Sequence, residues 1–259
     1  MHTEREARPA LWVLLAIGAF TGLVSGLFGV GGGVVIVPAL VALGIAQKRA
    51  SATSLVALLP ISIAGTTSYA IGGQVDVLAA LLLAAGSVVG SPIGVRLLHR
   101  LPQRVLPWIF VGFIALVVVG LLLSPPSRDG EVELTWWSAA ALVGIGLVAG
   151  LLSGLVGVGG GVVAVPGLEI VVGAGDLVAR GTSLAMMIPT TLVGILTHRT
   201  HFDVDVRSGL ALGAAAVVVT PLGAWLARLL DPAVGSVLFA LFLIAVSVVV
   251  VWRARPSRA

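Results

Sequence analysis

The chain has 259 residues, of which 58% are hydrophobic and only 10% are charged, and its formal net charge is +4. Soluble domains carry about 25% charged residues, so this composition excludes an ordinary water-soluble fold, and the absence of cysteine excludes disulfides and thiolate metal sites. The mean hydropathy is +1.15, and several apolar runs reach the roughly 20 residues that cross a bilayer. We therefore expect an all-α, polytopic membrane protein.

The predicted elements follow the same order in two halves of the chain. After an N-terminal tail (1–9), apolar segments occupy about 10–45, 52–72, 77–98 and 104–124. A polar linker (125–135) leads to segments at about 136–173, 182–198, 207–229 and 233–252, and a C-terminal tail (253–259) follows. The first transmembrane repeat is thus predicted over 10–124 and the second over 136–252.

An internal sequence repeat supports this division. Residues 21–40 read TGLVSGLFGVGGGVVIVPAL, and residues 149–168 read AGLLSGLVGVGGGVVAVPGL. An aspartate then recurs before the third apolar segment of each half, as Asp76 and Asp205, where N-capping of a helix is the expected role. A repeat that covers both halves predicts two copies of one helical unit.

The basic residues indicate how the two units face the membrane. The first segment of each half is too long for one span and contains GVGGG. We interpret it as a helix, a glycine break and a shorter helix, which either crosses the membrane or dips in and returns. All but three of the 15 basic residues then lie on one side, as the positive-inside rule requires; the exceptions are Arg128, Arg180 and Arg228. Each unit crosses an odd number of times, which predicts the inverted-topology repeats typical of secondary transporters.

The GVGGG sequences are the strongest candidates for a functional site. Glycine costs about 1 kcal/mol relative to alanine inside a helix, and non-helical backbone in a bilayer is tolerated only where protein buries it or water reaches it. The helix that restarts after each break directs free N–H groups at the break, which suits an anion. We expect the two breaks to meet and form one oxyanion site. The alternative is close helix packing, which small residues permit.

The candidate substrate-binding residues are the glycines of the breaks and the hydroxyl side chains near them. They are Ser25, Gly29, Gly31, Gly32, Gly33, Thr53 and Ser54 in the first half, and Ser153, Gly157, Gly159, Gly160, Gly161, Thr182 and Ser183 in the second. For the hydroxyls, the alternative is a hydrogen bond to their own helix. Another glycine series, Gly86, Gly90 and Gly94, is expected to serve helix packing.

Among the ionisable residues, Glu169 is the candidate for proton coupling. It lies inside an apolar segment, and a carboxylate within a membrane is a functional hypothesis by default; the alternative is a water-exposed position at the end of a span. His198 is expected at the membrane interface. The sequence contains no catalytic constellation, metal-ligand cluster or complete nucleotide fingerprint, so neither an enzyme nor a cofactor or metal site is expected.

The motif GLxSGLxGVGGGxxxVPxL, present once in each half, resembles that of the sulfite exporter TauE/SafE family, and the resemblance covers about 11–250. It implies a multi-pass permease of the prokaryotic inner membrane that exports sulfite, organosulfonates or other small sulfur-containing anions. The expected partners are a small anionic substrate and membrane lipid, with no nucleic acid. Symmetry favours a homodimer if the chain self-associates. A passive anion channel and a permease for an unrelated small solute are the alternatives.

Overall fold

The computed structural model describes residues 9–102, 105–123, 127–128, 130, 132, 134–199 and 204–254. The predicted tails (1–9 and 253–259) lie almost entirely outside these residues, and the linker (125–135) lies partly outside them. Within the described residues the chain forms ten α-helices.

The two halves contribute five helices each. The first half contains α1 (Leu11–Phe28), α2 (Gly33–Ala42), α3 (Gln47–Ala70), α4 (Val77–Arg100) and α5 (Leu106–Leu123). The second contains α6 (Trp136–Val156), α7 (Gly161–Val171), α8 (Asp176–Arg199), α9 (Val206–Leu229) and α10 (Pro232–Ala254). Seven helices in the described part are long and apolar enough to cross a membrane, whereas α2 and α7 are shorter. The prediction of an all-α polytopic membrane protein is confirmed.

Two helices begin earlier than predicted. The apolar segments were expected from 52 and 182, but α3 begins at Gln47 and α8 at Asp176. The predicted starts were wrong because charged residues were assigned to loops. In α8 those charges lie within the helix, where Asp176 and Arg180 form an ion pair one turn apart. The aspartates behave as expected: Asp76 accepts a hydrogen bond from the Ala79 amide (2.8 Å), and Asp205 accepts one from the Ser208 amide (3.1 Å).

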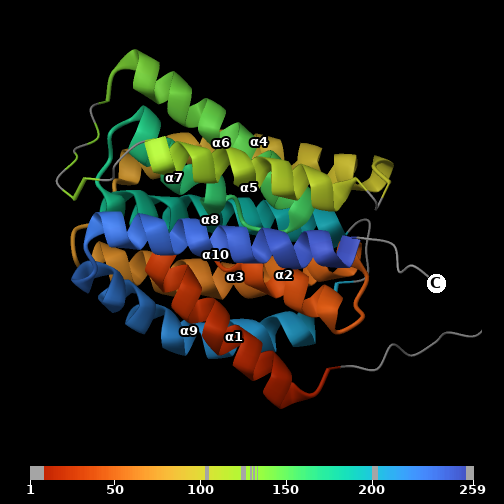
Figure 1. Ribbon diagram of the computed structural model, residues 1–259. Helices are drawn as coiled ribbons and strands as arrows, with labels where there is room; N and C mark the ends of the chain where they lie inside the picture. The colour runs from red at the N-terminus through yellow and green to blue at the C-terminus, as the bar shows by residue number, and fades with distance from the viewer. Residues whose placement is uncertain are drawn as a thin grey trace, which may run out of the picture.

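The helices of the two halves are interleaved. α1 packs along α9, α6 packs along α4, and α3 lies against α8. The α1–α9 contact is equivalent to the α6–α4 contact when the two halves are exchanged, and α3 and α8 are themselves equivalent helices. In Figure 1, α1 starts at the right end of the bundle and α2 leads back to that end, whereas α6 starts at the left and α7 leads back to the left. The inverted orientation of the two units across a membrane stays a prediction.

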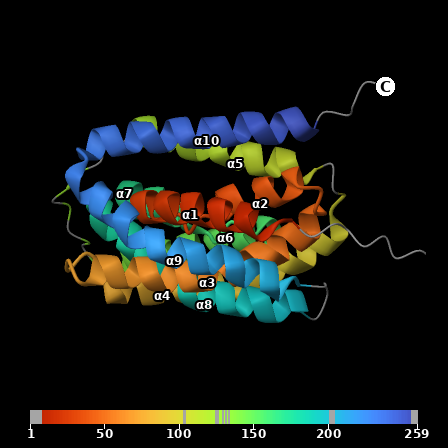
Figure 2. The ribbon, with the colours of Figure 1, turned by 90° about the horizontal axis from the view of Figure 1, so that it is seen from below.

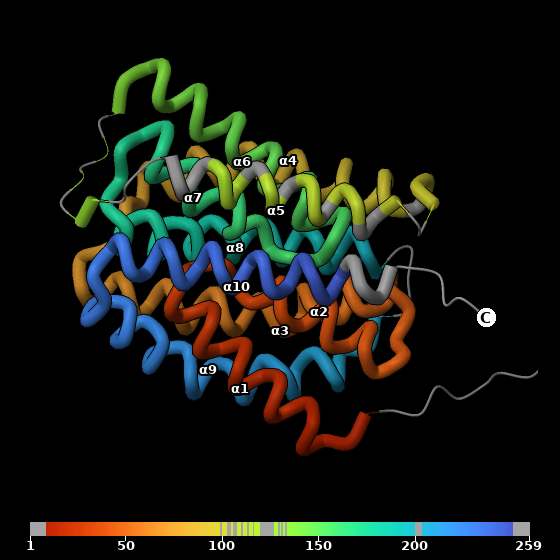
Figure 3. Tube along the Cα trace, in the orientation of Figure 1, coloured from red at the N-terminus to blue at the C-terminus, as the bar shows by residue number. Residues whose placement is uncertain are grey.

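The short helices lie in the middle of the bundle. α2 packs on α3 and α10, and α7 packs on α8 and α5. Figure 2 shows α5 and α10 together as an outer layer, with α3, α4, α8 and α9 toward the opposite face. Figure 3 traces the chain from α1 into α2 and from α6 into α7, where it changes direction. At ten and eleven residues, α2 and α7 extend only about 15 Å, half of a bilayer core of about 30 Å.

Glycines bring the paired helices into backbone contact. On either helix of the α4–α6 pair, a Cβ added at the contact would overlap a carbonyl oxygen of the partner. The glycines concerned are Gly86, Gly90 and Gly94 of α4 and Gly146, Gly150 and Gly154 of α6. On α1, Gly18, Gly22 and Gly26 meet the backbone of α9 in the same way. The packing role predicted for the glycine series of α4 is confirmed.

A valine in place of one of these glycines should force α4 and α6 apart. The Gly150→Val side chain would overlap the Ser87 carbonyl oxygen, and such overpacking typically costs about 1–3 kcal/mol. We expect a lower free energy of unfolding in detergent. The control is Gly144→Val on the same helix, where no atom lies within 4 Å of an added Cβ. Equal losses in the two variants would contradict the packing role.

Candidate functional site

Each glycine break is a left-handed stretch of backbone between two helices. Gly29 ends α1 with φ +71° and Gly32 precedes α2 with φ +82°. In the second half, Gly157 and Gly160 have φ +78° and +80°. Glycine adopts such angles without steric cost, whereas other residues are strained there. The predicted interruption of both helices is therefore present, and the backbone conformation at these positions is enough to require glycine, whether or not a solute binds there.

The two breaks lie against each other, as expected. A Cβ added to Gly33, the first residue of α2, would stand 2.6 Å from the Val158 Cα in the other break. A Cβ added to Gly161, the first residue of α7, would stand 2.7 Å from the Val30 Cα. The N-terminus of each short helix is thus in backbone contact with the break of the opposite half.

Serines from the opposite half bind the carbonyl groups of the breaks. Ser183 Oγ lies 2.6 Å from the Gly29 carbonyl oxygen, and Ser54 Oγ lies 2.6 Å from that of Gly157. Each also lies 2.8 Å from a carbonyl of its own helix, so one hydroxyl proton serves two acceptors. These two candidate residues hold the breaks in place, and their predicted contact with substrate stays a prediction.

The other candidate hydroxyls fall into two groups. Thr182 Oγ1 accepts a hydrogen bond from the Asp76 amide (3.0 Å), so it links α8 to the start of α4. The hydroxyls of Ser25, Ser153 and Thr53 are buried and have no hydrogen-bond partner among the described residues. Ser25 and Ser153 occupy equivalent positions in the two repeats. Buried polar groups are normally satisfied, so these three are the candidate hydroxyls that remain available to a solute, and their contact with one stays a prediction.

The glycines of the breaks differ in what surrounds them. Gly29 faces the Arg180 Cα, and Gly160 faces the Ala149 carbonyl oxygen, at 2.6 and 2.8 Å from an added Cβ. Gly33, Gly157 and Gly161 likewise meet backbone atoms of neighbouring segments, and Gly32 meets the Thr21 side chain. Close packing is sufficient to explain Gly33 and Gly161, and at the other four positions it adds to the conformational requirement for glycine. Close packing is the alternative raised from the sequence.

Gly31 and Gly159 are different because their neighbours are the ends of side chains. In both cases the nearest groups are the terminal atoms of Met187 and Leu58. The sequence interpretation missed these two residues because both resemble ordinary apolar core. The available signal was their equivalence in the repeats: each stands two positions before a helix-internal proline, Pro60 or Pro189.

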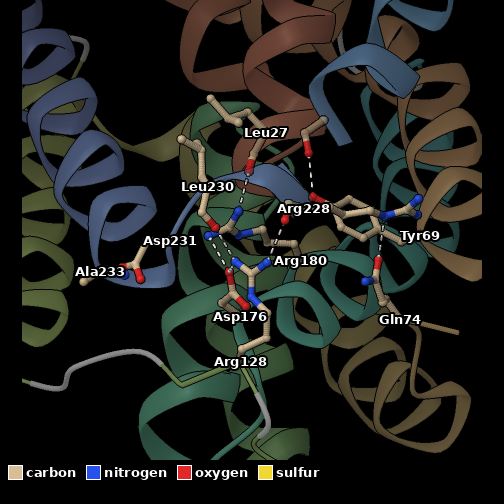
Figure 4. A network of polar contacts seen from close by, with 11 residues as sticks. Leu27, Tyr69, Gln74, Arg128, Asp176, Arg180, Arg228, Leu230, Asp231 and Ala233 are labelled. Atoms are coloured by element: carbon tan, nitrogen blue, oxygen red, sulfur yellow. Dashed lines mark hydrogen bonds and ion pairs between the residues drawn. The ribbon is translucent and has the colours of Figure 1, made fainter. Parts of the chain in front are cut away.

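A cluster of arginines lies beside the end of α1 (Figure 4). Arg180 is 4% exposed, forms an ion pair with Asp176 (3.1 Å) and donates to the Leu27 carbonyl (2.9 Å). Arg128 lies 3.3 Å from the same Asp176 oxygen. The sequence interpretation placed Arg180 outside the helices, although the four-residue spacing from Asp176 is that of a helical ion pair.

The same cluster extends to α3 and α9. Arg228 donates to the Gln74 side chain (3.1 Å) and to the Ser68 carbonyl (2.6 Å). The neighbouring Tyr69 hydroxyl donates to the Gly26 carbonyl (2.7 Å). The three basic residues that depart from the positive-inside pattern are therefore all held by hydrogen bonds to the protein.

The remaining ionisable candidates are both on helices. Glu169 is half-buried near the end of α7, and its role in coupling stays a prediction. His198, the last residue but one of α8, is fully buried in the protein, because α8 packs against α3 and α4 and this packing covers the face that carries His198. Its expected position at the membrane interface stays a prediction.

The interleaved helices, the membrane-spanning lengths and the two facing breaks define a multi-pass membrane transporter. The pattern of the sulfite exporter TauE/SafE family matches residues 1–121 and 142–259, and the chain belongs to this family.

Relatives from bacteria agree with that assignment. The probable membrane transporter protein YunE of Bacillus subtilis is 28% identical over 240 residues, which cover 83% of this chain and 88% of YunE. A probable membrane transporter protein of Xylella fastidiosa is 28% identical over 262 residues, covering 96% of this chain and 97% of the relative. This protein is accordingly a multi-pass protein of the prokaryotic plasma membrane.

Removing the Ser183 hydroxyl should destabilise the first break. In Ser183→Ala the buried Gly29 carbonyl loses its donor, and an unsatisfied buried group costs about 1–3 kcal/mol. We expect this loss in the free energy of unfolding in detergent. The matched control is Ser25→Ala, which removes a hydroxyl that has no partner among the described residues. A comparable loss in the control would contradict the assignment.

Removing one partner of the buried ion pair should lower the free energy of unfolding more than removing both partners. Arg180→Ala leaves the fully buried Asp176 carboxylate with Arg128 alone, and removing one partner of a buried pair typically costs about 3–5 kcal/mol. The double variant Arg180→Ala/Asp176→Ala should recover part of that loss. Thermal unfolding of the single and double variants measures the difference, and simple additivity would show that the two residues do not stabilise each other.

Proposed function

We propose that this protein is a secondary transporter that exports small sulfur-containing anions, such as sulfite or organosulfonates, across the inner membrane. The observation that carries the proposal is the contact between the two breaks, in which the N-terminus of α2 lies against the break that precedes α7 and the N-terminus of α7 lies against the break that precedes α2. The first N–H groups of a helix have no partner within the helix, and a helix N-terminus favours negative charge. Two such termini at one place favour an anion over a cation.

Hydroxyl groups support the same choice of solute. Ser25 and Ser153 lie in the last turns of α1 and α6, just before the breaks, and Thr53 lies on α3. A sulfite or sulfonate group has three oxygens that accept hydrogen bonds, so buried hydroxyl donors without protein partners suit it. The sulfur in the substrate is supported by the family to which the chain belongs.

Alternating access is the mechanism that we propose. We place the two units in inverted orientation, with all but three of the 15 basic residues on the cytoplasmic side. Because α1 pairs with α9 and α6 with α4, each mobile element contains helices from both units. Rocking of one such element against the other would open the breaks first to one side and then to the other. Glu169 is the proposed carrier of a coupling proton.

Transport by the purified protein in liposomes tests this function. We expect saturable movement of sulfite and of a small organosulfonate, accelerated by a pH gradient, and little movement of phosphate or acetate. Hydrogen bonds to a charged group contribute about 1.5–3 kcal/mol, so Ser25→Ala/Ser153→Ala should raise KM by more than about tenfold. Glu169→Gln should abolish the effect of the pH gradient while leaving exchange of the anion.

The test has one control variant and two results that would contradict the proposal. Thr67→Ala removes an exposed hydroxyl that bonds its own helix and should leave KM unchanged. Non-saturable flux with single-channel currents would establish a channel instead. Transport of cations or neutral solutes, with none of sulfite or sulfonates, would overturn the proposed substrate class.

A further inference from the structure

Two apolar side chains occupy the place where the breaks meet. Leu58 lies on α3 and Met187 on α8, and both are fully buried. A Cβ added at either Gly31 or Gly159 would overlap the terminal methyl group of Met187. The Leu58 methyl groups lie 3.4 and 3.0 Å from the same two positions. Equivalent residues of the two repeats thus touch both breaks at once.

Around the breaks, the contacts of Met187 and Leu58 are ones that side-chain rotation can change. Gly29, Gly33, Gly157, Gly160 and Gly161 face backbone atoms, which move only with the helices. Gly31 and Gly159, in contrast, face the end of a methionine, which has three rotatable bonds and fills space flexibly. A change of Met187 rotamer would therefore remove the closest contact at both glycines without displacing any backbone.

The helices that carry the pair each contain a proline close to it. Pro60 lies inside α3 and Pro189 inside α8, each two residues beyond the apolar side chain. A proline within a helix removes one backbone hydrogen bond and commonly kinks the helix. Bending at these points would move Leu58 and Met187 relative to the short helices, so both the side chains and their helices can open the contact.

We propose that Met187 and Leu58 form the barrier that closes the solute path between the two breaks, and that the size of residue 187 sets the largest anion that passes. This inference rests on the proposed transport function. An apolar pair at this point excludes a hydrated anion, because transfer of a charge into apolar surroundings without partners is strongly unfavourable. When the pair withdraws, the anion meets the backbone of Gly31 and Gly159 and the N-termini of the short helices.

Thiol labelling tests the barrier independently of transport. The chain contains no cysteine, so a single one can be introduced cleanly. Met187→Cys is compared with Met186→Cys, since Met186 is the adjacent methionine and equally buried, and it is absent from the nearest neighbours of the break glycines. In liposomes, an impermeant sulfonate-bearing methanethiosulfonate should label Met187→Cys several-fold faster than Met186→Cys, and a saturating concentration of a small alkanesulfonate, which does not react with the reagent, should slow that labelling. Equal rates in the two variants, or no effect of the alkanesulfonate, would overturn the barrier.

Transport by size variants tests the selectivity. Met187→Ala should increase the rate for benzenesulfonate relative to sulfite, and Met187→Phe should decrease the rates of both anions. Met186→Ala and Met186→Phe should leave the ratio of the two rates unchanged. If the wild-type protein moves neither anion, the proposed function fails. If it moves sulfite but the ratio is unchanged in the Met187 variants, the barrier is wrong while the function stands; the labelling result decides the matter for any variant that does not fold.

Discussion

Backbone-to-backbone contact between the two halves is the constraint on which the structure depends. At the centre, the first residue of each short helix lies against the break of the opposite half. Along the sides, carbonyl oxygens of one helix occupy the space where a glycine of its partner has no Cβ. Because lipid supplies little hydrophobic driving force between helices, close packing of this kind provides much of the association energy. The interleaving of α1 with α9 and α6 with α4 follows from it.

Close contact at the breaks leaves polar backbone groups that the membrane cannot satisfy. Each half supplies a donor to the break of the other half: the Ser183 hydroxyl donates to a carbonyl of the first break, and the Ser54 hydroxyl donates to a carbonyl of the second. At the last residues of α1 and α6, immediately before the breaks, the donors to the carbonyl groups differ between the halves. Ser51 donates to the Val156 carbonyl (2.8 Å), whereas Arg180, its counterpart, donates to that of Leu27. An arginine in this position needs a counter-charge, which Asp176 supplies. The charged cluster is therefore confined to one end of the bundle.

The repeat made most of the architecture predictable from the sequence. Hydropathy located the spans, and five glycines within a few residues required an interruption, because no continuous helix tolerates them. The same pattern could not distinguish a glycine that packs from one that meets a solute, since that depends on the neighbour across the contact. For Gly29 the neighbour is the backbone of Arg180, and for Gly31 it is the end of Met187. Both neighbours are far away in the sequence, as is the environment that buries His198.

The reciprocal bonds also affect how the protein is made. The Gly29 carbonyl and the Ser183 hydroxyl that binds it are separated by 154 residues. At a synthesis rate of about 5–20 residues per second, roughly 8–30 s pass between their emergence from the ribosome. During that interval the first unit is in the bilayer with its break lacking the serine donor that completes it. The centre of the protein therefore forms last, and a chain that ends before Ser183 leaves the Gly29 carbonyl without this donor in the bilayer.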